Sequence, residues 1–481
     1  MHARRVRRSA VTAADFRPLQ TVESNARRRP STRAAQSPAI LPGDVRRTMA
    51  AAGSAVIPGL GQLINARLRI ARWFALPAIL LLAISALIVA ANSHARLFAS
   101  LISPSVMNVA LALNLIVLGW RLASVAHAFF DRRYEGRPGR FGVVGLALIL
   151  TAVVAPHAIA NAWGNDAKAA FGNIFAGARE TGAAREASAT TDGPNLNERV
   201  NILVVGVDSF PGRTEKLTDS LMVVSIDPVG QTVSMISIPR DIVKAPLGNG
   251  NVFGPKINSL MSYADRHPAQ FPSGGIRALE VAIGTTLGLH IHYFARMDFV
   301  GFVKLIDSVG GVDIDVLRAF NDPKYDGLGV NPPNVFGWGV TLGPHHFNGF
   351  EALAYARSRY AIGESDFTRA ARQQEILLAL RTKLMSAGSL LGNAPSMFGA
   401  LGSLVSTDLP TDRLPDFAAI ADELDSASIY RMVLGHPLVM PANDPRLGSV
   451  QTLDLPAIRA AVEAIAPPPG QTPVPWSAPA R

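Results

Sequence analysis

Three long apolar stretches follow one another in the first third of the chain. They cover about 73–91, 98–120 and 141–160. Each is near the roughly 20 residues that a helix needs to cross a bilayer. Buried helices of a soluble core are a poor alternative for three such runs in a row. The pattern predicts a membrane region over 51–160 that contains three transmembrane helices.

From residue 198 onward the pattern changes to that of an α/β domain. Val200–Asp208 is a nearly continuous apolar run, typical of a strand covered on both faces. Further strands are expected over 221–226, 232–238, 294–297 and 312–316, and helices over 276–287, 299–309, 350–357, 367–385, 414–424 and 455–465. Strands interleaved with helices predict a layered domain over 198–466, with helices on both faces of the sheet.

Three segments lack such periodicity. Residues 1–50 are rich in Arg, Ala, Ser and Pro, which predicts a disordered basic cytoplasmic tail. Residues 161–197 are rich in Ala and Gly, and we interpret them as a linker that lets the following domain stand off the membrane. Residues 467–481 are rich in proline, which predicts a disordered end.

The net charge of +10 is unevenly distributed along the chain. Up to residue 160 there are 20 arginines, no lysine and five acids, whereas the rest has 26 basic and 31 acidic residues. A basic folded domain, as in nucleic-acid-binding proteins, is therefore absent. Four arginines between 132 and 140 place that loop in the cytoplasm by the positive-inside rule. Three crossings then put everything after residue 160 outside the cell membrane.

Two carboxylates are expected where the first two strands of the domain meet. Asp208 lies where the first strand ends, and Asp219 where the second begins. Ligands of α/β sheets bind beyond the carboxyl ends of strands, and carboxylates there can hold Mg²⁺ beside a phosphate. Each residue taken alone is better explained as the cap of a turn, and the metal interpretation depends on both carboxylates together with the arginines below. The chain has no cysteine, which excludes disulfides and thiolate metal sites.

Several cations follow at loops and helix ends. Pro239 ends the third strand and presents Arg240 with Asp241, a phosphate contact or else a surface ion pair. Lys256, two residues before Asn258, is a weaker candidate of the same kind. The densest group comprises Arg357, Arg359, Asp366, Arg369, Arg372, Gln373 and Gln374. Guanidinium groups match phosphate oxygens, so this run predicts a site for a polyanion such as a diphosphate. A solvated helix face that is rich in ion pairs is the alternative.

In this order, the motifs resemble the LytR-CpsA-Psr (LCP) family. The matching segments are Asn201-Ile-Leu-Val-Val-Gly-Val-Asp208, Thr218-Asp-Ser220, Ser237-Ile-Pro-Arg-Asp241, Lys256-Ile-Asn258, Asp307-Ser-Val-Gly-Gly-Val312, Ala352-Leu-Ala-Tyr-Ala-Arg-Ser-Arg359 and Asp366-Phe-Thr-Arg-Ala-Ala-Arg-Gln-Gln374. The resemblance covers about 199–385 and implies a three-layer α/β/α domain with a central mixed sheet. It also implies an apolar groove for a polyprenyl chain.

The resemblance further implies an activity. It is the Mg²⁺-assisted transfer of a glycopolymer from a polyprenyl-pyrophosphate carrier to a peptidoglycan hydroxyl, at the outer face of the bilayer. Asp208 and Asp219 would be metal carboxylates, and Asp208 would take the proton of the acceptor. The diphosphate contacts would be Arg240, Lys256, Arg357, Arg359, Arg369 and Gln373, with Asp366 orienting the arginines.

Two features depart from the family pattern. Leu217 stands two residues before Asp219, where the family usually has an arginine. Three predicted spans replace the single anchor common in the family, although an odd number in both cases keeps the domain outside. Two alternatives to transfer stay open: a polyprenyl-pyrophosphate phosphohydrolase, and a regulatory membrane protein that binds a lipid phosphate without turnover.

Overall fold

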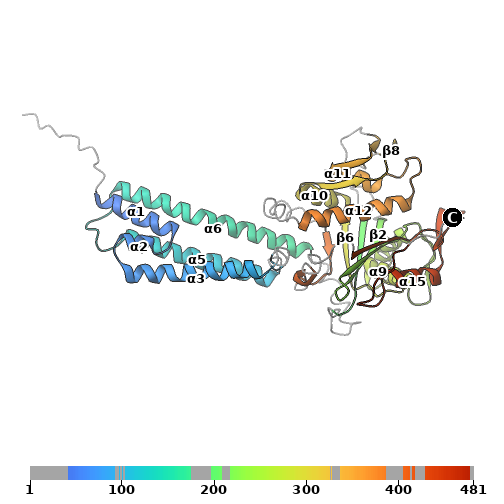
Figure 1. The fold of residues 1–481 in the computed structure, drawn as a ribbon, viewed down its shortest axis with the longest axis horizontal. Helices are drawn as coiled ribbons and strands as arrows, with labels where there is room; N and C mark the ends of the chain where they lie inside the picture. The colour runs from blue at the N-terminus through green and yellow to red at the C-terminus, as the bar shows by residue number, and fades with distance from the viewer. Residues whose placement is uncertain are drawn as a thin grey trace, which may run out of the picture.

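The computed structural model describes residues 42–92, 97, 100, 103–174, 197–208, 217–325, 327, 336–385, 405–411, 414–417 and 428–476. Over these residues the chain forms an elongated helical bundle followed by an α/β domain (Figure 1). Most of the predicted basic tail, and the predicted linker from residue 175 to 196, lie outside the described residues.

The bundle contains three long apolar helices, as the hydropathy pattern predicts. They are α3 (Leu68–Ala91), α5 (Pro104–Phe129) and α6 (Arg140–Ile174). All three are long and apolar enough to cross a membrane. Their large apolar side chains are mostly exposed, including Leu82 and Leu148, as expected for surfaces that face lipid acyl chains.

The structure differs from the sequence prediction at the start of the bundle. Helix α1 (Pro42–Val56) begins inside the stretch that we predict to be disordered, and α2 (Leu60–Ile64) follows it. Ala51 of α1 packs against Val125 and Phe129 of α5. The small side chains of α1 allow this close packing. They give the sequence little apolar periodicity, which is why we predicted disorder there.

Two other boundaries of the bundle also differ. Helix α5 continues past Arg121, which we expected to end the second span, because the Arg121 guanidinium donates to the Ala55 carbonyl and contacts His157. The end of α1 therefore receives a donor for one of its unpaired carbonyls. Helix α6 continues to Ile174, so residues 161–174 are helical and not part of a flexible linker.

The domain is built on a six-stranded mixed sheet with the order β11-β6-β1-β2-β3-β12. Its strands are β1 (Val200–Asp208), β2 (Leu217–Asp227), β3 (Thr232–Ser237), β6 (Tyr293–Asp298), β11 (Val405–Thr407) and β12 (Ile429–Val433). Strand β1 is antiparallel to β2 and parallel to β6. The parallel pair needs a crossover connection, which α8 (Leu260–Arg266) and α9 (Gly274–Leu287) help to form between β1 and β6.

Helices cover both faces of this sheet (Figure 1). On one face, Leu203 and Leu221 pack with residues of α8 (Leu260–Arg266), α9 (Gly274–Leu287) and α15 (Leu455–Ile465). On the other face, Met222 and Met235 pack against α12 (Asp366–Met385). Alternate residues of each strand point to opposite faces, so both faces are apolar and the three-layer α/β/α prediction is confirmed.

Helices α10 (Phe299–Ser308) and α11 (Gly349–Arg357) complete the α12 side of the sheet. A second apolar cluster, including Ile306, Val312 and Tyr355, joins them to a two-stranded sheet. The remaining elements are β4 (Ala245–Pro246), β5 (Val252–Phe253), η1 (Ile257–Ser259), β7 (Val312–Val316), β8 (Phe320–Asp322), β9 (Trp338–Val340), β10 (Gly343–Phe347), β13 (Val439–Asp444) and β14 (Gly448–Leu453). Of the helix predicted over 414–424, residues 414–417 are helical and the rest lies outside the described residues.

We predicted that the proline-rich end, 467–481, is disordered, but the structure shows part of it packed against the domain. The Arg199 guanidinium donates to the Pro467 carbonyl at 2.8 Å and pairs with Asp227 at 3.2 Å. Trp476 packs against the apolar core. Proline has no backbone N–H, but its carbonyl still accepts hydrogen bonds. Side chains of the domain can therefore hold a proline-rich segment in place.

Candidate functional site

A polar cavity of about 430 Å³ opens at one end of the central sheet. It is lined by Asp208, Leu217, Asp219, Arg240, Asp241, Lys256, Asn258, Asp322, Lys324, Tyr325, Arg357, Arg359, Tyr360 and Arg369. Six of these side chains are cationic and four are carboxylates. The wall therefore carries a surplus of two positive charges, which favours an anionic ligand.

The two carboxylates at the strand ends come together because β1 and β2 are antiparallel. Asp208, the last residue of β1, lies opposite Leu217, the first residue of β2. Asp219 has no partner in the strand register, because Gly206 pairs with Ser220 and Val207 with Thr218. It is the extra residue of a β-bulge, a feature that re-aims one side chain. The bulge directs Asp219 into the cavity that Asp208 also lines.

Two ion pairs bring cations to this end of the sheet. Arg240, three residues after β3, contacts Asp219 at 2.5 Å, and Lys256 contacts Asp241 at 2.9 Å. Burial alone would lower the pKa of Arg240, but the carboxylates of Asp219, Asp366 and Asp241 raise it above its ordinary value. Arg240 remains charged at neutral pH, and both cations line the cavity.

The other arginines arrive from α11, α12 and the loop between them. Arg369 on α12 pairs with Asp366 at 3.0 Å and is buried. Burial lowers the pKa of Arg369, and the charges of Arg240 and Arg359 lower it further, against the attraction of Asp366 and Asp219. One turn further along α12, Gln373 accepts a hydrogen bond from Ser220 at 2.8 Å. The polar face of α12 is thus joined to β2.

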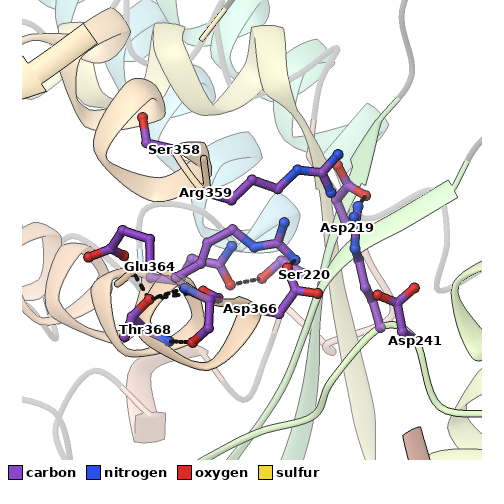
Figure 2. Close-up of polar contacts among 12 residues, drawn as sticks. Asp219, Ser220, Asp241, Ser358, Arg359, Glu364, Asp366 and Thr368 are labelled. Atoms are coloured by element: carbon purple, nitrogen blue, oxygen red, sulfur yellow. Dashed lines mark hydrogen bonds and ion pairs between the residues drawn. The ribbon is translucent and has the colours of Figure 1, made fainter. Parts of the chain in front are cut away.

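Arg357 and Arg359 differ from the other two arginines in one respect. Among the described residues, no carboxylate lies within ion-pair distance of either guanidinium, whereas Arg240 and Arg369 each have one. The Arg357 guanidinium lies 4.2 Å from the centre of the Phe299 ring. Arg359 extends from the loop after α11 towards Asp219 in Figure 2 and donates to the Tyr360 hydroxyl at 2.8 Å. These two arginines are among the six cations that give the cavity its surplus of positive charge.

A second, apolar cavity of about 160 Å³ adjoins the polar one. It lies between the α12-facing side of the sheet and helices α10, α11 and α12, and its apolar lining includes Val204, Met222, Ala295, Met297, Phe299, Phe302, Leu353, Ile376, Leu377, Leu380 and Val405. Asp219, Arg357 and Arg369 line both cavities. An amphiphile with an apolar tail and an anionic head would match this arrangement.

The structure thus brings together the residues that the family resemblance places in the site. Asp208, Asp219, Arg240, Lys256, Arg357, Arg359 and Arg369 line the polar cavity. Asp366 and Gln373 line a small adjoining pocket together with Asp219, Arg240 and Arg369. Residues separated by more than 150 positions meet here because β1, β2 and the loop after β3 end beside α12.

Arg372 is the exception within the arginine-rich run. It does not line the polar cavity. Its guanidinium pairs with Glu364 at 3.1 Å, donates to the Ser358 carbonyl and lies 4.3 Å from the centre of the Phe320 ring. The prediction that all arginines of this run surround one anion is therefore wrong for Arg372, because a buried carboxylate attracts its side chain to the other side of the loop.

Sequence reasoning missed Asp322, Lys324, Tyr325 and Tyr360, which complete the wall of the polar cavity. Asp322 is buried, and its Oδ2 atom accepts from the backbone N–H groups of Arg359 and Tyr360 at 2.9 and 3.1 Å. The Lys324 ammonium lies 5.4 Å from the centre of the Tyr360 ring. These residues lie in a loop-rich region without periodicity, where only the run Asp-Pro-Lys-Tyr gives a signal.

The donor set of the cavity suits magnesium bound jointly with a phosphate. Mg²⁺ is usually held by one or two carboxylates, with the other positions filled by phosphate oxygens and water. Asp208 and Asp219 provide two carboxylates in one cavity. The described residues contain no group of three His, Asp or Glu side chains that would hold a metal without such a ligand. Asp208 and Asp219 are thus the residues that could hold Mg²⁺ together with a phosphate ligand.

Comparisons with known proteins show which family the chain is similar to. The LytR_cpsA_psr family model matches residues 172–437. The chain is 33% identical over 222 residues to the regulatory protein MsrR of Staphylococcus aureus (strain Mu50), covering 46% of this chain and 59% of MsrR. It is 35% identical over 191 residues to the polyisoprenyl-teichoic acid–peptidoglycan teichoic acid transferase TagV of Bacillus subtilis (strain 168), covering 40% of this chain and 45% of TagV. The chain thus matches about half of the length of these curated relatives.

Solved structures show a similar relation. The crystal structure of Bacillus subtilis TagV has 27% sequence identity and a TM-score of 0.44, and the match covers 56% of this chain and 96% of that one. A structure of TagT bound to LI-WTA has 20% identity and a TM-score of 0.42, with 57% and 93% covered.

Proposed function

Because the chain belongs to the LytR_cpsA_psr family, we propose that it transfers a glycopolymer from a polyprenyl-pyrophosphate carrier to a hydroxyl group of peptidoglycan. TagV carries a name that describes such a transfer for teichoic acid. One observation of this chain carries the proposal. The apolar cavity meets the polar cavity at Arg357 and Arg369, and Arg357 has no acidic partner among the described residues.

The shape and charge of the two cavities support this class of substrate. A polyprenyl diphosphate that carries a sugar is an amphiphile whose diphosphate has two negative charges. The polar wall has a surplus of two positive charges at the junction with the apolar cavity. An isoprenoid chain in the apolar cavity would gain about 0.8 kcal/mol per buried CH₂. The diphosphate would then lie between Arg357, Arg359 and Arg369.

The chemical step is an in-line displacement at phosphorus. The acceptor oxygen forms a bond to the phosphorus that carries the sugar, and the bond from that phosphorus to the bridging oxygen breaks. Polyprenyl phosphate leaves, and the glycopolymer becomes joined to the wall by a phosphodiester. The proton of the acceptor hydroxyl passes to a carboxylate, for which Asp208 is our candidate because it is buried and lines the polar cavity.

The arginines stabilise the charge that develops during this step. Arg240 and Arg369 are fixed by Asp219 and Asp366, so they need little reorganisation when charge builds up on the phosphate oxygens. Arg357 and Arg359 supply charge that no carboxylate of the described residues neutralises. When bound at Asp208 and Asp219, Mg²⁺ would act as a Lewis acid on the diphosphate oxygens.

The bundle gives the proposed topology. Seven exposed arginines lie at one end of it, namely Arg46, Arg69, Arg72, Arg132, Arg133, Arg137 and Arg140. By the positive-inside rule this end is cytoplasmic, so α6 emerges on the outer side, where the domain follows. The site then lies on the same side of the bilayer as peptidoglycan.

A non-catalytic role is the second candidate, and one relative favours it. MsrR is named a regulatory protein, and a chain that held the lipid diphosphate without turnover would use the same two cavities. Hydrolysis, with water as the acceptor, would likewise use the same groups.

Reconstitution of the full-length chain in lipid nanodiscs separates these activities. The substrate is a polyprenyl diphosphate that carries a labelled glycan, supplied with Mg²⁺ and peptidoglycan. Label joined to peptidoglycan supports transfer, free glycan phosphate without joined label supports hydrolysis, and binding without any product supports the regulatory role. We expect transfer, with a loss of about 10²–10³-fold for Arg359→Ala. The matched control is Arg431→Ala, which removes an exposed arginine of β12 outside both cavities.

A further inference from the structure

The loop that follows α11 carries a buried ion pair that the proposed chemistry does not use. The Arg372 guanidinium and the Glu364 carboxylate are 3.1 Å apart, and their side chains are 7% and 3% exposed. Glu364 also accepts from the Thr368 hydroxyl at 2.7 Å. A buried pair of this kind costs desolvation energy and is weak evidence of stabilisation, so its presence requires another explanation.

The contacts of Arg372 extend to both sides of this loop. Besides Glu364, the guanidinium donates to the carbonyl of Ser358, at the start of the loop. It also lies over the rings of Phe320 on β8 and Tyr355 on α11, with centroid distances of 4.3 and 5.4 Å. Its other nitrogen atoms have no hydrogen-bond partner in the part of the chain that the structure describes. The side chain of Arg372 therefore contacts both ends of the loop after α11 and the neighbouring strand β8.

The fastened loop is the segment that presents the two arginines without acidic partners. Arg357 immediately precedes Ser358, and Arg359 immediately follows it. The backbone N–H groups of Arg359 and Tyr360 are held from the other side by Asp322. The backbone that carries these two cations is thus bound to α12 through Arg372 and to β8 through Asp322.

Electrostatics explains why the loop needs such fastening. Arg359 contributes to the lowered pKa of the buried Arg369, after burial itself and beside Arg240, which shows that these cations repel each other. Without ligand, repulsion would favour a loop that swings Arg359 out into solvent. The Arg372–Glu364 pair has no net charge and does not line the polar cavity, so it holds the loop without adding to the attraction for the anion.

We propose that Arg372 is a positioning residue that holds Arg357 and Arg359 at the diphosphate through its contacts with Ser358 and Glu364. The part of this inference that concerns turnover rests on the proposed function, whereas the part that concerns binding of a diphosphate does not. A displacement of reacting groups by about 1 Å can cost about 10²-fold in rate. We therefore expect Arg372→Gln to weaken diphosphate binding and turnover by about that factor, with partial rescue in Arg372→Lys.

The test is a double-mutant cycle in the full-length protein in nanodiscs, with geranylgeranyl diphosphate as the probe of binding. If Arg372 acts in part through Arg359, then Arg372→Gln weakens diphosphate binding less in an Arg359→Ala background than in the original protein. Geranylgeraniol, which has the same tail but no phosphate, should bind equally well to all variants. If transfer fails in the unmutated protein while geranylgeranyl diphosphate still binds, the proposed function is refuted, but the cycle remains measurable.

A matched control separates positioning from loss of stability. Arg199 forms a similarly buried pair with Asp227 at 3.2 Å, and neither residue lines either cavity. We expect Arg199→Gln to lower the melting temperature while leaving diphosphate affinity unchanged in the folded protein. Equal losses of affinity in Arg199→Gln and Arg372→Gln, or losses that are independent in the cycle with Arg359→Ala, would overturn the proposal.

Discussion

Replacing Arg357 by methionine should lower activity strongly without a comparable loss of stability. Arg357 lines both cavities and has no acidic partner among the described residues, and its Nη1 atom is buried without a hydrogen bond. Methionine keeps most of the length of the side chain and its contact with Phe299, but removes the charge. The substitution therefore tests the cation itself with little change in packing.

The expected magnitudes follow from these contacts. Loss of the interaction with the Phe299 ring, 4.2 Å away, costs about 0.5–2 kcal/mol. Removing the buried donor that has no hydrogen-bond partner should stabilise the folded state by about 1–3 kcal/mol. The free energy of unfolding should thus stay within about 1 kcal/mol of its original value or rise. Loss of one cation at the reacting phosphate should lower kcat/KM by about 10²–10³-fold, or about 2.7–4 kcal/mol of transition-state stabilisation.

Two measurements on the full-length protein check this prediction. Thermal unfolding followed by circular dichroism gives the change in stability, and transfer of labelled glycan gives kcat/KM. Asp366→Ala serves as the contrasting variant, because it removes the partner of the buried Arg369 and should reduce both quantities. An Arg357→Met protein that unfolds at a much lower temperature, or that keeps its full rate, would refute the assignment of Arg357 to the anion.

Three further predictions concern the metal, the tail and the fold. Removing Mg²⁺ with EDTA should abolish transfer by the original protein and weaken diphosphate binding, and added Mg²⁺ should restore both; unchanged rates in EDTA would exclude the metal. Ala295→Trp should fill much of the 160 Å³ apolar cavity. Exclusion of one five-carbon isoprene unit at about 0.8 kcal/mol per carbon removes about 4 kcal/mol, so long-tailed substrates should bind more weakly by up to about 10³-fold. A diphosphate with a short tail should be unaffected, and equal losses for both tails would contradict the placement of the prenyl chain. Asp227→Ala should destabilise the domain by about 3–5 kcal/mol, because it leaves the buried Arg199 without its partner, and denaturant unfolding measures that loss.

Local rules account for the parts of the fold that the sequence predicts well. The spans and the strand Val200–Asp208 are continuous apolar runs, whose burial depends on composition more than on neighbours. The boundaries were less accurate, as at α1 and α6, where packing between helices extends or begins a helix that periodicity does not reveal. Periodicity also does not reveal the hydrogen bond from Arg199 to Pro467, because it joins residues that are 268 positions apart.

The candidate site shows the same division. The residue types that suit a diphosphate were evident from the arginine-rich run, because guanidinium chemistry does not depend on the fold. The bulge that turns Asp219 into the cavity was not, because it arises only when β2 pairs with β1. Asp322 was missed for a similar reason, since its role depends on the loop after α11 that its carboxylate holds.

Arg369 and Arg372 illustrate the physical limit of the sequence. They lie three residues apart on α12, so helical spacing places them on neighbouring parts of one surface, and the sequence determined that both are cationic and near the same loop. Only the tertiary structure decided that Arg369 lines the cavity while Arg372 turns to Glu364 and Phe320. A long, flexible side chain takes the direction of its partners, and those partners are brought to it by the folding of distant segments.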